Sequence, residues 1–218
     1  QTSDWRDDWN AEVERIYDLG HEPLPSQGEI IGVVNHLSLD EDAVVCDAGS
    51  LPSDLHKLWQ SRNPKSYHME YGYARMGYAL SRALGVKMAD PDRGVTVLAG
   101  EDGWLRISQD LVTAIRWNIQ LTVVVVRSMG DRMPVDYAGH AVIFGAHAVS
   151  VCSKNAFEKA FRDARNADRV SVIVVDTDGS QRVPVYESWG TDPSEEPIDN
   201  PDGLAPCSQA EESVAGLC

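Results

Sequence analysis

Short continuous runs of apolar residues alternate along this chain with segments that have the spacing of amphipathic helices. Strands are predicted at residues 43–47, 67–70, 95–99, 121–126, 147–151 and 170–176, and the segments between them are predicted to be mainly helical. Ser26, followed three residues later by Glu29, is typical of a capping box that begins one of these helices. Because the apolar runs are continuous rather than alternating, the sequence predicts an α/β fold, with a doubly wound, mostly parallel sheet and helices on both faces.

The two ends of the chain differ from the middle. Near the start, Trp5 and Trp9 have the i,i+4 spacing of a helix, and we expect an amphipathic helix that lies on a partner surface and is ended by the prolines at 23 and 25. The last part is rich in Pro, Asp, Glu and Ser and has no periodic pattern. The predicted organisation is therefore an N-terminal helical arm at 1–24, an α/β domain at 25–184 and an acidic C-terminal tail at 185–218.

The net charge of −15 is concentrated in the two ends, with seven acidic residues in 1–22 and eight in 187–218. Such a chain is repelled by nucleic-acid phosphates and by anionic membranes, so neither is an expected partner. No apolar run reaches membrane-spanning length, no secretory signal stands at the start, and the four cysteines form no CxxC pair. We therefore expect a cytoplasmic protein with reduced thiols.

Glycine-containing turns follow three of the predicted strands, at residues 48–50, 100–103 and 127–130. In a doubly wound sheet, ligands bind at the carboxyl ends of the strands, near the point where the strand order reverses. The backbone N–H groups of such turns suit a phosphate. The pattern favours a small-molecule ligand, although the same turns also occur as purely structural connections.

The residues of these segments resemble a known family. The matching segments include Cys46-Asp47-Ala48-Gly49-Ser50-Leu51-Pro52, His68-Met69-Glu70-Tyr71-Gly72-Tyr73, Leu84-Gly85-Val86-Lys87-Met88-Ala89 and Leu111-Val112-Thr113-Ala114. In this order they resemble the C-terminal module of the thiamine-diphosphate-dependent trihydroxycyclohexanedione hydrolases of inositol catabolism. The resemblance extends from about Trp5 to Trp189, and in that family this module holds the diphosphate of the cofactor.

The resemblance implies a thiamine diphosphate site. The residues that it assigns to the cofactor are Gly49 and Ser50 beside the diphosphate, Gly72, Met76 and Gly77 beside the rest of the cofactor, and Gly100 as the first residue of the metal-binding motif. In the family that motif is Gly-Asp-Gly, followed by an Asn after the next strand, and the Asp and Asn bind a divalent ion, usually magnesium.

This chain departs from the metal motif. The ligand Asp falls on Glu101, a slip of one residue would put Asp102 there, and the Asp-Asn pair falls on Arg127 and Ser128. Magnesium tolerates displaced ligands poorly. We therefore expect a degenerate metal site, and a vacant site is one of its possible states. Two interpretations of Arg127 stay open. Its guanidinium replaces the metal and pairs with the diphosphate, or it pairs with Glu101 or Asp102 and fills an empty site.

The catalytic residues are not identified by the sequence. His68 and Glu70 flank Met69 and would share a strand face, so they are weak candidates for an acid/base pair, with a structural pair as the alternative. Catalysis with thiamine diphosphate also needs a glutamate from a pyrimidine-binding module, which this sequence is not expected to contain.

Three functions therefore remain open. The chain is a subunit of a split thiamine-diphosphate enzyme that acts on C–C bonds next to carbonyls, with a pyrimidine-module chain or a second copy of itself as its partner. Alternatively, it is a non-catalytic structural or regulatory partner of an active paralogue, since such modules pair across subunit interfaces. In the third interpretation it is a cofactor-free cyclase, lyase or hydrolase that has taken over the pocket for a biosynthetic pathway.

Overall fold

The computed structural model describes residues 2–70, 75–128 and 135–183. Within these ranges a single parallel sheet has the strand order β2-β1-β3-β4-β6-β5. Its strands are β1 (Ala43–Cys46), β2 (Tyr67–Met69), β3 (Val95–Gly100), β4 (Thr122–Ser128), β5 (His147–Val151) and β6 (Ser171–Thr177). In the sheet, β2 lies on one side of β1, and the next strand of the chain, β3, lies on the other side. The strand order therefore reverses between β1 and β3. The prediction of a doubly wound α/β fold is confirmed.

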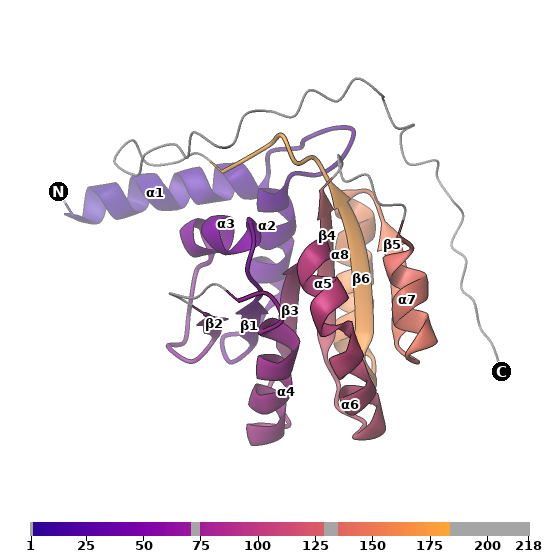
Figure 1. Ribbon diagram of the computed structural model, residues 1–218. Helices are drawn as coiled ribbons and strands as arrows, with labels where there is room; N and C mark the ends of the chain where they lie inside the picture. Colours follow the sequence, from indigo (N-terminus) through magenta and orange to yellow (C-terminus); the bar gives the residue numbers. More distant parts are fainter. Residues whose placement is uncertain (1, 71–74, 129–134, 184–218) are drawn as a thin grey trace. The chain divides into compact units, whose positions relative to one another are not determined.

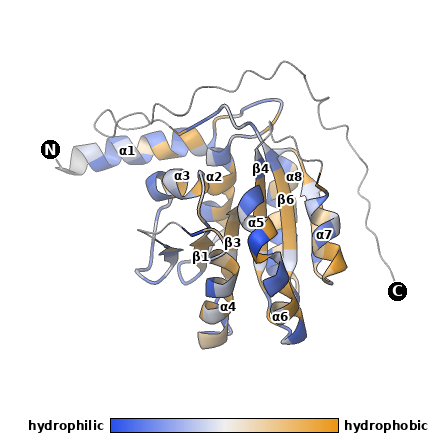
Figure 2. Cartoon of the chain, viewed as in Figure 1, coloured by the Kyte–Doolittle hydropathy of each residue, from blue (hydrophilic) through white to orange (hydrophobic). Residues whose placement is uncertain are grey.

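Helices cover both faces of this sheet (Figure 1). They are α1 (Thr2–Tyr17), α2 (Gln27–Leu37), α3 (Leu51–Leu58), α4 (Ala79–Ala89), α5 (Glu101–Ile107), α6 (Leu111–Arg116), α7 (Tyr137–Ile143) and α8 (Lys154–Asn166), with a 3-10 turn at Ser108–Asp110. The central strands β1, β3, β4 and β6 are strongly hydrophobic (Figure 2) because nearly all their residues are buried, whereas the edge strands β2 and β5 are partly exposed. Val97 and Val125 pack under α4 to α7, whereas Leu98 and Val124 pack under α1 to α3 and α8.

The start of α2 follows from its local sequence. The Ser26 side chain accepts a hydrogen bond from the Glu29 N–H, and the Glu29 carboxylate accepts one from the Ser26 N–H at 2.9 Å. These two bonds satisfy backbone donors that the first turn of a helix leaves unpaired. The predicted capping box is confirmed.

The N-terminal helix packs on the domain itself. Its buried residues Ile16 and Tyr17 lie against α2, where Gly28 leaves room for Ile16 and Gly32 for Tyr17. A Cβ on Gly32 would stand 2.6 Å from the ring of Tyr17, so this close contact requires glycine. The helix ends at Tyr17, before the prolines, and residues 1–184 form one compact unit. One face of this helix therefore packs on its own domain, while Trp5 is 73% exposed, and the contact of the helix with a partner surface stays a prediction.

One other local prediction differs from the structure. Residues 100–103 were expected to be a loop, but α5 begins at Glu101 directly after β3. Gly85 lies inside α4, which continues to Ala89. The predicted acidic tail lies outside the described residues. In the described part of the chain, no helix has both the length and the apolar character needed to cross a bilayer.

Candidate functional site

A cavity of about 220 Å³ lies at the carboxyl ends of β1, β3 and β4. It sits at the point where the strand order reverses, which is where doubly wound sheets bind their ligands. Its lining consists of residues 48–51 after β1, residues 100–103 after β3, Val126 and Ser128 of β4, and the side chains of Gln27 and Met76. Fold topology thus brings together residues that are up to about a hundred positions apart in the chain.

The predicted cofactor residues meet at this cavity. Gly49, Ser50, Met76 and Gly100 line it. An added Cβ on Gly49 or on Gly100 would meet no atom within 4 Å, so a ligand can approach the backbone there. Gly72 lies outside the described residues.

Two helices begin at the cavity without a side-chain cap. These are α3, after Ser50, and α5, after Gly100. By contrast, α2 and α8 are capped by the side chains of Ser26 and Ser153. The first turn of a helix has backbone N–H groups without partners inside the helix and a partial positive charge. The beginnings of α3 and α5 are therefore suited to donate hydrogen bonds to the oxygen atoms of an anionic ligand.

Asp47, which sequence reasoning did not single out, connects the end of β1 to the segment before α4. Its carboxylate, buried to 1% exposure, accepts hydrogen bonds from the N–H groups of Gly77 at 3.0 Å and Tyr78 at 3.1 Å. A Cβ on Gly103 would stand 2.2 Å from this carboxylate, so Gly103 packs directly on it. Gly77, which the resemblance places beside the cofactor, has a φ of +97° and donates its N–H to Asp47. An aspartate directly after a fully apolar strand was the signal available in the sequence.

The residues that the resemblance assigns to a metal also line the cavity. Glu101 and Asp102 are in the first turn of α5, and Ser128 ends β4. Ser128 offers a hydroxyl in place of the amide oxygen of the family motif. In residues 2–70, 75–128 and 135–183, no three His, Cys, Asp or Glu side chains are grouped to hold an ion. Magnesium is usually bound by one or two carboxylates together with phosphate and water oxygen atoms in near-octahedral geometry. The degenerate metal site therefore stays a prediction.

Arg127 is directed away from the cavity. Because β4 continues to Ser128, two residues beyond its predicted end, Arg127 is a strand residue that faces the side opposite to Val126 and Ser128. Its guanidinium donates to both carboxylate oxygens of Asp176, at 2.6 and 2.8 Å. The pairing partner is thus Asp176 rather than Glu101 or Asp102, which corrects the prediction, and the geometry gives no support to a direct contact with a diphosphate.

His68 and Glu70 are not brought to the cavity. His68 lies in the edge strand β2, and its Nδ1 is 3.3 Å from a guanidinium nitrogen of Arg82 on α4. Neither His68 nor Glu70 is among the described residues that line the cavity. Burial, followed by the positive charge of Arg82, lowers the pKa of His68 below its ordinary value of 6.5. This environment favours a neutral structural histidine.

The lowered pKa of His68 predicts a loss of stability in mild acid. The unfolded chain takes up this proton near pH 6.5, before the folded chain does, so the free energy of unfolding is full above that pH and falls as the pH drops below it. Urea unfolding at several pH values should show a smaller acid loss for His68→Gln than for the wild type. The exposed His147→Gln is the matched control. Equal acid losses in the two variants would contradict this assignment.

Comparison with known proteins supports the family. The model of the thiamine pyrophosphate enzyme C-terminal TPP binding domain matches residues 47–133. Two similar curated proteins are 3D-(3,5/4)-trihydroxycyclohexane-1,2-dione hydrolases. The hydrolase from Shouchella clausii is 30% identical, and the match covers 78% of this chain and 30% of the hydrolase. The hydrolase from Bacillus subtilis is also 30% identical, and the match covers 72% of this chain and 28% of the hydrolase. The chain therefore spans about a third of the length of these relatives.

Solved structures of similar fold include a thiamine diphosphate-dependent enzyme. The 4-hydroxybenzoylformate decarboxylase of Rhodococcus jostii superposes with a TM-score of 0.65 at 20% identity, over 71% of this chain and 33% of that one. The benzoylformate decarboxylase of Polynucleobacter necessarius gives 0.65 at 18% identity, over 76% and 35%. At such identities these structures support the fold alone. From the sequence match and the fold together, this chain carries the C-terminal module of the thiamine pyrophosphate enzyme family, in a form similar to that of the trihydroxycyclohexanedione hydrolases.

Proposed function

We propose that this chain binds thiamine diphosphate in the cavity and acts as the diphosphate-binding module of an enzyme that works on C–C bonds next to carbonyls. The observation that carries the proposal is the convergence of Gly49, Ser50 and Gly100 with two uncapped helix starts at the reversal of strand order. A second module, which binds the pyrimidine ring and supplies the activating glutamate, completes the site from a partner chain. A second copy of this chain is the other candidate for the partner.

The residues of the chain bind and orient the ligand. The first turns of α3 and α5 would donate backbone N–H groups to the diphosphate, except at Pro52, which has none, and Ser50 would lie beside it in the cavity lining. Asp47 fixes Gly77 and Tyr78, and so fixes Met76, which lines the cavity next to them. When bound, the cofactor would supply a carbon nucleophile for the substrate carbonyl and an electron sink for the C–C bond that breaks next to it.

Calorimetric titration of the chain with thiamine diphosphate, with and without the pyrimidine-module partner, tests this proposal. Gly100→Val places a side chain in the open space at the cavity without strain, because the φ of Gly100 is −79°. We expect this variant to lose binding. Gly85→Ala also enters open space, but inside α4, and should bind like the wild type. If Gly100→Val binds as tightly as Gly85→Ala, the cofactor does not occupy this cavity.

The acidic lining favours a second candidate function. Glu101 and Asp102 are the charged side chains among the described residues that line the cavity. A structural or regulatory partner of an active paralogue needs the fold but not the cofactor. So does a cofactor-free enzyme that uses the pocket. Absence of binding by the wild type, alone and with the partner, would favour these functions over the cofactor module.

A further inference from the structure

The charged side chains of the cavity lining are carboxylates. Among the described residues that line the cavity, Glu101 and Asp102 are the charged ones, and Gln27 and Ser128 add an amide and a hydroxyl. A diphosphate is itself a multiply charged anion, so the two carboxylates repel it at short range. Binding of a diphosphate here therefore requires a cation that is held between the two sets of oxygen atoms.

Gln27 places a buried amide at the wall of this cavity. It is the first residue of α2, it is 9% exposed, and it lines the cavity. Its Nε2 donates a hydrogen bond to a carboxylate oxygen of Asp54, in the first turn of α3, at 2.7 Å. An ionised carboxylate only accepts hydrogen bonds, so the amide cannot be turned round. The carbonyl oxygen Oε1 is therefore the amide atom that is held away from Asp54 and is available to the cavity.

The partner of Gln27 is itself buried and held in place. Asp54 is 4% exposed, and the Nζ of Lys57, one turn later on α3, lies 3.9 Å from its other carboxylate oxygen. A hydrogen bond to an ionised group is stronger than one between neutral groups, and more so where water is excluded. This contact joins the start of α2 to the start of α3, so Gln27 has a fixed orientation at the cavity.

We propose that Gln27 gives a bound magnesium ion the amide oxygen that the metal motif lacks at Ser128, and that this ion joins the diphosphate to the cavity. The inference rests on the proposed function, because it concerns how the same cavity binds the same cofactor. Glu101 or Asp102 would add a carboxylate oxygen, and phosphate and water oxygens would complete the coordination. A carbonyl oxygen is a hard ligand that suits this ion. The fold compensates for the missing Asn with a residue about a hundred positions earlier in the chain.

Calorimetric titration with thiamine diphosphate in magnesium and in EDTA tests the proposal. The wild type should bind at least about tenfold more tightly in magnesium. Gln27→Met keeps the length of the side chain but has no amide oxygen. It should bind about tenfold more weakly than the wild type in magnesium, and within about threefold of the wild type in EDTA. Gln120→Met is the matched control, because it removes a partly buried amide that donates to the Ala167 carbonyl, before the start of β4, and it should bind like the wild type in both buffers.

A second substitution separates a metal ligand from a structural role. Ser128→Asn restores an amide at the position where the family has its metal-binding Asn. Gln27→Met/Ser128→Asn should therefore regain binding in magnesium to within about threefold of the wild type. An amide at the end of β4 does not replace the contact with Asp54, so a double variant as weak as Gln27→Met would overturn the proposal. A Gln27→Met protein that binds as tightly as the wild type in magnesium would overturn it too.

The wild type distinguishes this inference from the function on which it rests. Equal affinity in magnesium and in EDTA would overturn the role of Gln27 and leave the proposed function intact. No binding in either buffer, with the partner present, would overturn both. If binding in EDTA is too weak to measure, the affinity of the double variant in magnesium decides, and urea unfolding of each variant checks that the titrated protein is folded.

Discussion

Asp47→Ala should lower the free energy of unfolding by roughly 3–5 kcal/mol, because it removes a buried charged acceptor and leaves two backbone donors without a partner. Those donors are the N–H groups of Gly77 and Tyr78, which hold the segment before α4 against the end of β1. Urea unfolding followed by circular dichroism measures the loss. Because Met76 lines the cavity next to this segment, the variant should also bind thiamine diphosphate more weakly.

Two further variants check that Asp47 acts through these contacts. Asp47→Asn keeps one acceptor oxygen and the shape of the side chain. It should therefore lower the free energy of unfolding by less than half as much as the alanine variant does. Gly103→Ala should be destabilising alone, since its Cβ meets the Asp47 carboxylate, but should cost far less in the Asp47→Ala background. Additive effects of these two substitutions would show that Gly103 and Asp47 do not contact each other.

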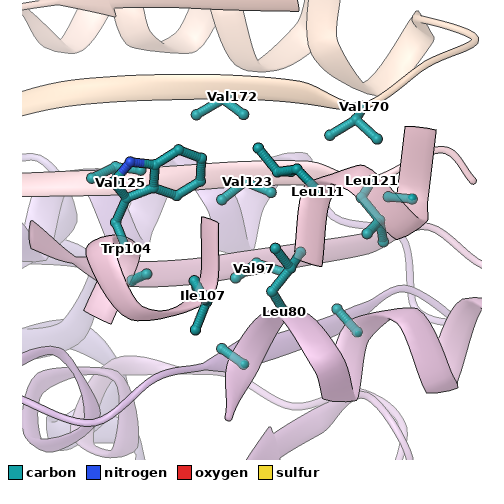
Figure 3. Packing of buried hydrophobic residues seen from close by; sticks show 14 of the residues in the cluster. Leu80, Val97, Trp104, Ile107, Leu111, Leu121, Val123, Val125, Val170 and Val172 are labelled. Atoms are coloured by element: carbon teal, nitrogen blue, oxygen red, sulfur yellow. The ribbon is translucent and has the colours of Figure 1, made fainter. Parts of the chain in front are cut away.

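Trp104→Ala should be comparably severe, with a loss of roughly 3–5 kcal/mol expected for a fully buried aromatic side chain. Trp104 is 0% exposed and belongs to the buried cluster that also contains Val97, Ile107 and Val125 (Figure 3). It anchors α5, the helix whose first turn carries Glu101 and Asp102 to the cavity. We expect the variant to lose cooperativity of unfolding together with ligand affinity.

The matched control is Trp104→Phe. Among the described residues, the Trp104 Nε1 has no hydrogen-bond partner. Substitution by phenylalanine therefore removes part of the buried side-chain volume but no hydrogen bond. Its loss should be well below that of the alanine variant. A Trp104→Ala protein that unfolds at the wild-type urea concentration would show that α5 is held by other contacts.

Local patterns determined much of the architecture from the sequence. The capping box of Ser26 and Glu29 closes within four residues, so its geometry depends on little else. The continuous apolar runs could be buried only in a sheet covered on both faces, which fixed the fold class. Parallel strands bring their carboxyl ends to one edge, so Gly49, Gly100 and Ser128 were expected to meet, and they line one cavity.

The direction of individual side chains was decided by the tertiary structure. The sequence could not show that β4 continues to Ser128, because Arg127 and Ser128 are polar and resemble the start of a turn. Pairing with β6 extends the strand, and the alternation of strand side chains then turns Arg127 toward Asp176, 49 residues later in the chain. In the same way, only the packing of α1 against Gly28 and Gly32 shows that the first helix covers its own domain. The sequence alone predicted that the segments after β1, β3 and β4 meet at one ligand site. Contacts between distant segments decided which of them face into it, because strand register and helix packing depend on both partners.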